Sequence, residues 1–202
     1  MTDATDSRMD LRRAVESRWT RRRRRAARRL AVEEPSFAAP LLQRLLTDGP
    51  TIRVAAAAAE SLRALDDPCA RAVLLEALDH PHDWVRLLAA EALAPHAEER
   101  AWRVLVASLD SDDVDMYAHA MDGIWRFGGE RPLKLTERLV RERDDEPFLR
   151  ELAVRTLRFE GARRSIAALE TALSDSQRHV RAAAREAIDT IEARGQADGV
   201  DG

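Results

Sequence analysis

The chain has 202 residues, of which 45% are hydrophobic and 34% charged but only 4% aromatic. This length suits one elongated domain or a modest globular one, and an interior with so few aromatic residues must be filled by Ala, Leu and Val, as closely packed helices prefer. Cys69 is the only cysteine, which excludes an internal disulfide framework and a cysteine-based zinc cluster and fits a reducing compartment. No apolar run is long enough to span a bilayer, and the N-terminus lacks the apolar core of a secretion signal. We therefore expect a cytoplasmic protein, from a bacterium or an archaeon.

Charge is distributed unevenly along the chain. Residues 1–30 hold eleven arginines and four acids, a net charge of +7, whereas the remaining residues hold 22 basic and 32 acidic side chains, a net charge of −10. The overall charge of −3 is therefore the sum of a basic N-terminal segment and an acidic remainder, so the molecule is dipolar. Lys134 is the only lysine among 33 basic residues, which we attribute to a genome biased toward arginine codons.

The N-terminal region is predicted to be a short tail followed by a basic helix. Residues 1–7 are small and polar, and we expect them to be a disordered tail. Residues 8–35 are expected to form an arginine-rich helix that packs as a cap or an arm. Its apolar positions follow a slowly drifting stripe, formed by Leu11, Val15, Trp19, Ala26 and Leu30.

Residues 36–193 contain five imperfect copies of one unit. One apolar column, at steps of 31, 31, 33 and 31 residues, comprises Val54, Val85, Met116, Leu149 and Val180. A second column, eight residues further on, comprises Leu62, Leu93, Ile124, Leu157 and Ile188. A period of this length is typical of stacked repeats.

Spacings of three and four within each copy predict two helices per unit and no strands, so the class is all-α. The predicted pairs are 37–47 with 51–65, 69–79 with 83–94, 98–109 with 113–127, 132–143 with 147–159, and 162–173 with 177–193. Gly128 and Gly129 are a natural helix stop. Residues 194–202 are expected to be a disordered tail.

Two copies carry a motif that resembles a known family. Residues 85–93 read VRLLAAEAL and residues 180–188 read VRAAAREAI, which is similar to HEAT repeats, and closest to the short HEAT-like type named after phycobilin lyases. The resemblance implies a right-handed α-solenoid of about five helix pairs. It also implies that the recurrent Arg86, Arg150 and Arg181 form a structural ladder with turn acids such as Asp79 or Asp175.

Enzymes with such a scaffold provide three tests for catalysis. Deoxyhypusine hydroxylase, a HEAT-repeat enzyme, holds iron with His-Glu pairs, and no His precedes a Glu here. We interpret His80, His82 and Asp83 as solvated residues of a turn and not as ligands of a cation. An alkylpurine DNA glycosylase needs an acid beside an aromatic cleft, for which Asp122 near Trp125 and Tyr117 is the local candidate. A bilin lyase would need a tetrapyrrole site, and no motif marks one. We therefore expect no catalytic residue, no metal and no cofactor.

The basic helix is the strongest positive feature of the sequence. Its arginines comprise Arg18, Arg21, Arg22, Arg23, Arg24, Arg25, Arg28 and Arg29. Such a run can neutralise phosphates of nucleic acid or contact a membrane surface, and Trp19 could stack on a base. Two alternatives remain open: a solvated helix, and an arm whose charge pairs with the acidic repeats.

The second helix of each pair is predicted to line the concave side, where a partner would bind. Its charged column comprises Glu60, Glu91, Asp122, Arg155 and Glu186, and Trp125 with Tyr117 and Met121 forms an expected patch beside it. We predict a non-catalytic scaffold that displays this surface to a protein or peptide. The alternatives are a nucleic-acid-binding accessory protein that uses Arg21 to Arg25, and an enzyme of the glycosylase or lyase type.

Overall fold

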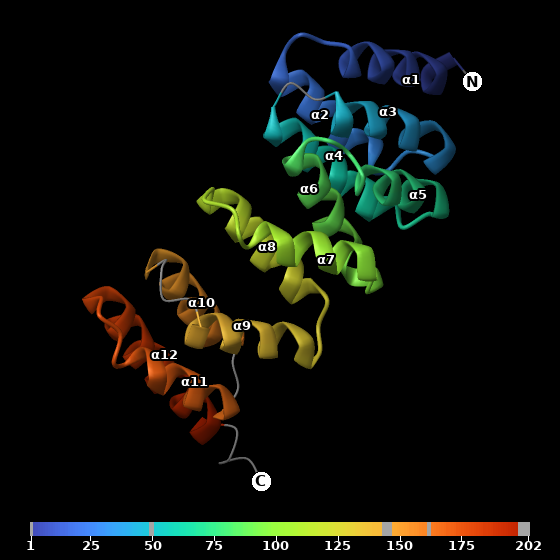
Figure 1. The fold of residues 1–202 in the computed structure, drawn as a ribbon. Helices are drawn as coiled ribbons and strands as arrows, with labels where there is room; N and C mark the ends of the chain where they lie inside the picture. Colours follow the sequence, from blue (N-terminus) through green and yellow to red (C-terminus); the bar gives the residue numbers. More distant parts are fainter. Residues whose placement is uncertain (1, 49–50, 143–146, 161–162, 198–202) are drawn as a thin grey trace. The chain divides into compact units, whose positions relative to one another are not determined.

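The computed structural model describes residues 2–48, 51–142, 147–160 and 163–197 (Figure 1). Within these ranges all regular structure is helical, which confirms the all-α class. The chain divides into two compact units, residues 1–127 and residues 128–202. No helix in the described ranges is both long and apolar enough to cross a bilayer.

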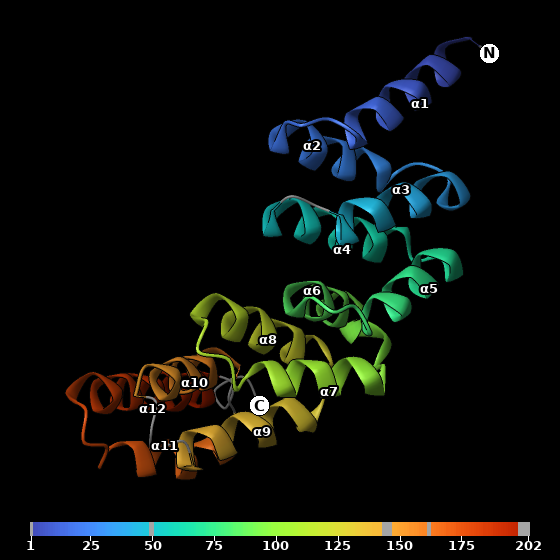
Figure 2. The same cartoon turned by 45° about the horizontal axis from the view of Figure 1, so that its top comes forward.

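The first unit is built from four helix pairs. Its helices are α1 (Thr2–Val15), α2 (Thr20–Leu30), α3 (Pro35–Thr47), α4 (Ile52–Leu65), α5 (Pro68–Ala77), α6 (Asp83–Leu93), α7 (Glu99–Ser108) and α8 (Val114–Arg126), with a short 3₁₀ turn η1 (Ala94–His96) after α6. The second helices form one layer in which α2 packs on α4, α4 on α6 and α6 on α8 (Figure 2). On the other side α1 packs on α3 and α3 on α5.

The second unit repeats this scheme with two pairs. Its helices are α9 (Glu130–Glu142), α10 (Pro147–Glu160), α11 (Ile166–Ala172) and α12 (Arg178–Ala197), with a 3₁₀ turn η2 (Arg163–Ser165). Here α10 packs on α12 and α9 on α11. All five predicted helix pairs are therefore present, although α12 extends to Ala197 and so enters the segment that was expected to be a disordered tail.

The N-terminal region differs from the single helix that was expected. The structure has two helices, α1 and α2, and α1 already begins at Thr2, inside the predicted tail. The chain breaks between them because the Ser17 hydroxyl accepts a hydrogen bond from the Trp19 backbone N–H at 3.3 Å, an interaction that competes with continuation of a helix. Leu11 and Val15 are buried, but Trp19 is 62% exposed and does not lie on their stripe.

An alanine column shows that α1 and α2 form a repeat of their own. The second helix of every pair carries an alanine at the same place, at steps of 31, 31, 31, 33 and 31 residues, and each is fully buried. The column comprises Ala27, Ala58, Ala89, Ala120, Ala153 and Ala184. Since Ala27 of α2 shares this register, the basic segment is an additional first repeat that continues the layer of second helices.

The two apolar columns predicted from the sequence lie in the core. Nine of their ten members are buried, and Ile188 is half-buried. Burying a Val, Leu or Ile side chain contributes about 1.5–3 kcal/mol relative to leaving it exposed. Stacking of neighbouring repeats therefore supplies most of the stability, as in other solenoids.

The turn before each second helix is held by an arginine from that helix. Arg86 donates to the carbonyls of His80 at 2.8 Å and Pro81 at 3.0 Å. Arg181 makes the equivalent bonds to the carbonyls of Asp175 at 2.7 Å and Ser176 at 2.9 Å. The expected ladder is therefore structural, but Arg86 does not reach Asp79.

Arg150 forms the ladder in its predicted form, by pairing with an acid of the next repeat. Its Nε and Nη2 donate to the two carboxylate oxygens of Asp175 at 2.7 and 3.1 Å, and the side chains are only 5% and 8% exposed. The backbone N–H of Gln177 also donates to Asp175, at 2.8 Å. This buried pair joins α10 to the turn before α12.

Replacing Arg150 by Ala is expected to lower the free energy of unfolding by about 3–5 kcal/mol, because the carboxylate of Asp175 stays buried without its cation. Arg155→Ala is the matched control. Arg155 lies on the same helix, is 63% exposed and pairs with Glu151 at 2.6 Å, so its loss should cost about 0–1 kcal/mol. Urea unfolding measures both variants, and equal losses would contradict this account.

Acid should weaken the same pair. The hydrogen bond from Arg150, helped by the Gln177 N–H, holds the pKa of Asp175 below its ordinary value of 3.8. The resulting stabilisation is complete above the unfolded-state pKa and is lost as pH falls through the lower folded-state pKa. The difference in unfolding free energy between the native chain and Asp175→Asn should therefore be constant above about pH 5 and shrink toward pH 2. A difference that does not change with pH would refute this.

Candidate functional site

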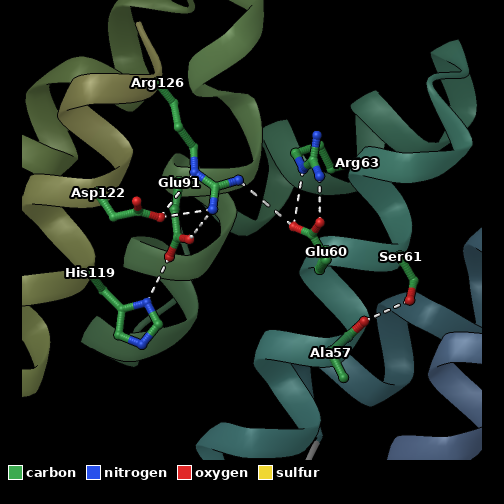
Figure 3. Close-up of polar contacts among 8 residues, drawn as sticks. All are labelled: Ala57, Glu60, Ser61, Arg63, Glu91, His119, Asp122 and Arg126. Carbon is green, nitrogen blue, oxygen red and sulfur yellow. Dashed lines mark hydrogen bonds and ion pairs between the residues drawn. The ribbon is translucent and has the colours of Figure 1, made fainter.

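Three of the predicted surface acids converge on one side of the first unit. Glu60, Glu91 and Asp122 lie on α4, α6 and α8, each two residues after an alanine of the buried column. Two residues correspond to about 200° around a helix, so these side chains point away from the core. Figure 3 shows their carboxylates facing one another across the three helices.

One guanidinium connects the three carboxylates. Arg126, at the end of α8, lies 2.7 Å from Asp122, 3.4 Å from Glu91 and 3.9 Å from Glu60. Arg63 of α4 donates its Nε to Glu60 at 3.0 Å and also contacts the second oxygen of that carboxylate. We call Glu60, Arg63, Glu91, His119, Asp122 and Arg126 together the Arg126 network.

Glu91 is the most enclosed member of the Arg126 network. Its side chain is 14% exposed, and its second carboxylate oxygen lies 2.8 Å from Nδ1 of His119. The close approach of α8 to α6 at this point depends on Gly123. A Cβ at that position would lie 3.2 Å from the Cα of Glu91 and 2.6 Å from a methyl group of Leu105. The ring of His119 also packs edge-on against Trp84, with centroids 5.5 Å apart.

The electrostatics favour the charged forms of these groups. The hydrogen bond from Arg63 lowers the pKa of Glu60, against a smaller opposing effect of burial. The hydrogen bond to Glu91 raises the pKa of His119, again against burial. The three carboxylates and two guanidiniums leave one negative charge while His119 is neutral, and none once it is protonated.

A small hollow of about 160 Å³ lies beside the Arg126 network. Its floor consists of Ala56, Ala59, Leu88 and Ala92. Glu60, Glu91 and His119 complete its lining. An apolar floor with a charged border can accept a side chain that has an aliphatic body and a polar tip.

The predicted column continues in the second unit with different pairings. There Arg155 binds Glu151 of its own helix at 2.6 Å, and Glu186 of α12 binds Arg158 of α10 at 2.7 Å. Each therefore belongs to a local pair within residues 128–202. Only three of the five column members share one network.

The aromatic patch predicted around Trp125 is wrong in two of its three members. Trp125 is half-buried, whereas Tyr117 is fully buried and Met121 is 4% exposed. Both belong to the core because they fall on the inward side of α8. Asp122 forms an ion pair with Arg126 at 2.7 Å. Because Tyr117 is buried, Trp125 and Tyr117 do not form the open aromatic cleft beside this acid that was considered for a glycosylase.

The arginines of α2 divide into two groups. Arg23 and Arg24 are half-buried, and Arg23 donates to the Asp48 carbonyl at 3.3 Å. The exposed group, which we call the α2 arginine stripe, comprises Arg21, Arg22, Arg25, Arg28 and Arg29. Within the described ranges none of its members forms an ion pair, and its one side-chain hydrogen bond joins Arg29 to the Ser7 hydroxyl at 3.2 Å.

Acids near the N-terminal pair bind other arginines. Glu33 and Glu34 contact Arg8, both at 3.4 Å, and Glu16 contacts Arg44 at 3.3 Å. These bonds dock α1 against α3 and the loop before it. The segment is thus packed as the first repeat, but the α2 arginine stripe is not neutralised by the acidic repeats in the part of the chain that the structure describes.

The histidine turn before α6 has structural contacts. The His80 ring accepts a hydrogen bond from the His82 backbone N–H at 3.1 Å, and Asp83 binds Arg86 at 2.5 Å. Among the described residues no three His, Cys, Asp or Glu side chains are grouped as metal ligands.

The stacked helix pairs and the charged surface on their second helices define an α-solenoid repeat protein. A family model described as HEAT repeats matches the chain three times, at residues 11–94, 38–121 and 102–189. Together these matches cover most of the sequence, so the chain belongs to the HEAT-repeat family. The first match begins inside α1, in agreement with the N-terminal pair being a repeat.

Several solved structures are similar to this chain. An engineered protein is 20% identical with a TM-score of 0.49, over 93% of this chain and 97% of that one. A designed armadillo repeat protein is 18% identical with a TM-score of 0.47, over 90% and 98%. Human deoxyhypusine hydroxylase in complex with glycerol is 16% identical with a TM-score of 0.39, over 91% and 83%. A search among curated proteins gave no match.

The Glu91–His119 contact should be visible in a titration. The hydrogen bond to Glu91 raises the pKa of His119 from its ordinary value of 6.5. The NMR titration midpoint of His119 should therefore lie above 6.5 and should fall in the Glu91→Gln variant. The stabilisation is present below the unfolded-state pKa and is lost as pH rises through the folded-state pKa. Glu76→Gln, on α5, should leave the midpoint unchanged. A midpoint at or below 6.5 would show that the contact does not form.

Proposed function

We propose that this protein is a non-catalytic HEAT-repeat adaptor that binds a partner protein or peptide on the exposed side of α4, α6 and α8. The observation that carries this proposal is the Arg126 network, in which one guanidinium contacts carboxylates from three successive second helices, α4, α6 and α8. Such a surface is presented by a rigid scaffold, because α4 packs on α6 and α6 on α8. The single cysteine suits work in the reducing cytoplasm.

The network and the hollow beside it provide complementary parts of a binding site. The alanine and leucine floor can take the aliphatic part of a partner side chain, and Glu60 and Glu91 can bind its polar or basic tip. Because the side chains of the network are already held by one another, little conformational entropy is lost when a partner binds. Trp125 of α8 remains a further candidate contact in the first unit, and Arg155 and Glu186 remain candidate contacts within the second unit.

A second function is favoured by the α2 arginine stripe. Five exposed guanidiniums without a described ion pair can neutralise phosphates, which gives salt-dependent and sequence-independent binding of nucleic acid. This surface belongs to the first repeat, whereas the Arg126 network belongs to the second to fourth repeats. The two functions can therefore be tested by separate variants.

The test of the adaptor is affinity capture from the native cell with nuclease present. We expect a protein that the native chain retains and that Glu60→Arg with Asp122→Arg loses by tenfold or more. Glu76→Arg with Glu170→Arg is the matched control, because these exposed acids lie on the first helices α5 and α11. Circular dichroism verifies that all variants remain helical.

Two outcomes would contradict the proposal that a partner binds on α4, α6 and α8. A partner retained equally by both double variants would place binding elsewhere on the molecule. Capture that disappears with nuclease treatment would favour the nucleic-acid function instead.

A further inference from the structure

The α2 arginine stripe presents positive charge along a single helix face. Its members follow spacings of one, three, three and one residues, so their side chains emerge on the same side of α2. From Arg21 to Arg29 the stripe is about 12 Å long, at 1.5 Å per residue. That length matches roughly three phosphates of a stacked strand.

Among the described residues, no acid forms an ion pair with the stripe, so the repulsion between its arginines is not compensated there. Arg21 and Arg25, and Arg25 and Arg29, are like charges four residues apart, an arrangement that destabilises a helix. Among the described residues that line the groove between α1 and α2, Asp10 is the one acid, and it lies 3.9 Å from Arg13. A polyanion is the ligand that would remove this repulsion.

A groove accompanies the stripe. It lies between α1 and α2, has a volume of about 470 Å³, and is lined by Arg21, Arg22, Arg25 and Arg29 above the apolar side chains of Leu11, Ala14 and Ala26. Leu11 and Ala26 are buried and Ala14 is half-buried, so the groove offers a ligand mainly its guanidiniums, which suit phosphates.

Trp19 adds a stacking surface at one end of the stripe. It directly precedes α2, is 62% exposed, and has the Arg18 guanidinium 4.9 Å from its ring centroid. An exposed indole beside arginines can stack on an unpaired base, whereas the bases of a duplex are already stacked on one another. The apolar residues of α2 itself, Ala26, Ala27 and Leu30, are buried, so this helix has no free apolar face with which to enter a membrane.

We propose that the groove between α1 and α2 binds single-stranded nucleic acid, with phosphates on the α2 arginine stripe and a base stacked on Trp19. This inference rests on the nucleic-acid function proposed above and specifies its ligand. Recognition would be independent of sequence, because the proposed contacts are with phosphates and the face of a base.

The experiment measures fluorescence anisotropy of labelled 20-nucleotide single strands, DNA and RNA, and of the corresponding duplex. We expect single strands to bind more tightly than the duplex. Trp19→Ala should weaken single-strand binding about 5- to 150-fold, the usual loss of one base–aromatic stack, and leave duplex binding unchanged. Quenching of tryptophan fluorescence on binding should disappear in the same variant.

The stripe is tested with Arg21, Arg25 and Arg28 changed together to Gln. The slope of log affinity against log salt should fall by about two, at roughly 0.7 per phosphate contact in a single strand. Changing the same three residues to Lys should restore most of the slope. Arg53, Arg178 and Arg185, which are exposed and lie outside α2, provide the matched control when they are changed together to Gln. Thermal melting confirms that each variant is folded.

The remaining outcomes separate the two proposals. Equal binding of duplex and single strands, unaffected by Trp19→Ala, would overturn the single-strand inference while the nucleic-acid function stands. If neither the single strands nor the duplex bind at about 50 mM salt, both the single-strand inference and the nucleic-acid function are overturned. Tighter binding to polyglutamate or to anionic vesicles would overturn both in favour of an acidic protein or a lipid surface.

Discussion

The close contact between successive second helices is the constraint on which the rest of the structure depends. Each second helix carries an alanine with no exposed surface, from Ala27 to Ala184. A larger side chain there would overpack the interior of its own unit, where α2, α4, α6 and α8 pack on one another and α10 packs on α12. Because α4, α6 and α8 approach closely, the guanidinium of Arg126 can reach carboxylates on all three helices. Gly123 brings α8 closer still at Glu91. The surface network is thus a consequence of small residues in the core.

The periodicity of apolar residues predicted the helices and the core, because each repeat has the same local pattern of apolar positions. The helix pairs lie where the spacings of three and four placed them, and the apolar columns that begin at Val54 and Leu62 are buried except at Ile188, which is half-buried. The same reasoning failed at the N-terminus. Trp19 lies four residues after Val15 and so fits a continuous stripe, and nothing in that spacing reveals that Ser17 interrupts the helix. The alanine at position 27 was the signal that would have identified the first repeat.

The candidate site was only partly accessible from sequence. Alignment of the repeats brought Glu60, Glu91 and Asp122 into one column, because residues at equivalent positions of stacked helices face the same side. Half of the role of Arg126 could be read from its distance of four residues from Asp122. Its reach to Glu91, and the contact of His119 with the same carboxylate, depend on the spacing between helices. Tyr117 was wrongly predicted to be exposed, because a shift of one residue along a helix turns a side chain by about 100° and can move it from the surface to the core.

The N-terminal pair shows how such an array can diversify. Ala27 is buried like the equivalent alanines of the other repeats, while the exposed charged residues of α2 are all arginines, in contrast to the mixed charge of α4 and α6. Interior and exterior positions alternate around each helix, so the outside of one repeat can be rewritten without disturbing how its neighbours assemble. Duplication of a repeat followed by drift of its outer face can therefore give a repeat array a new surface without changing the surfaces of the other repeats.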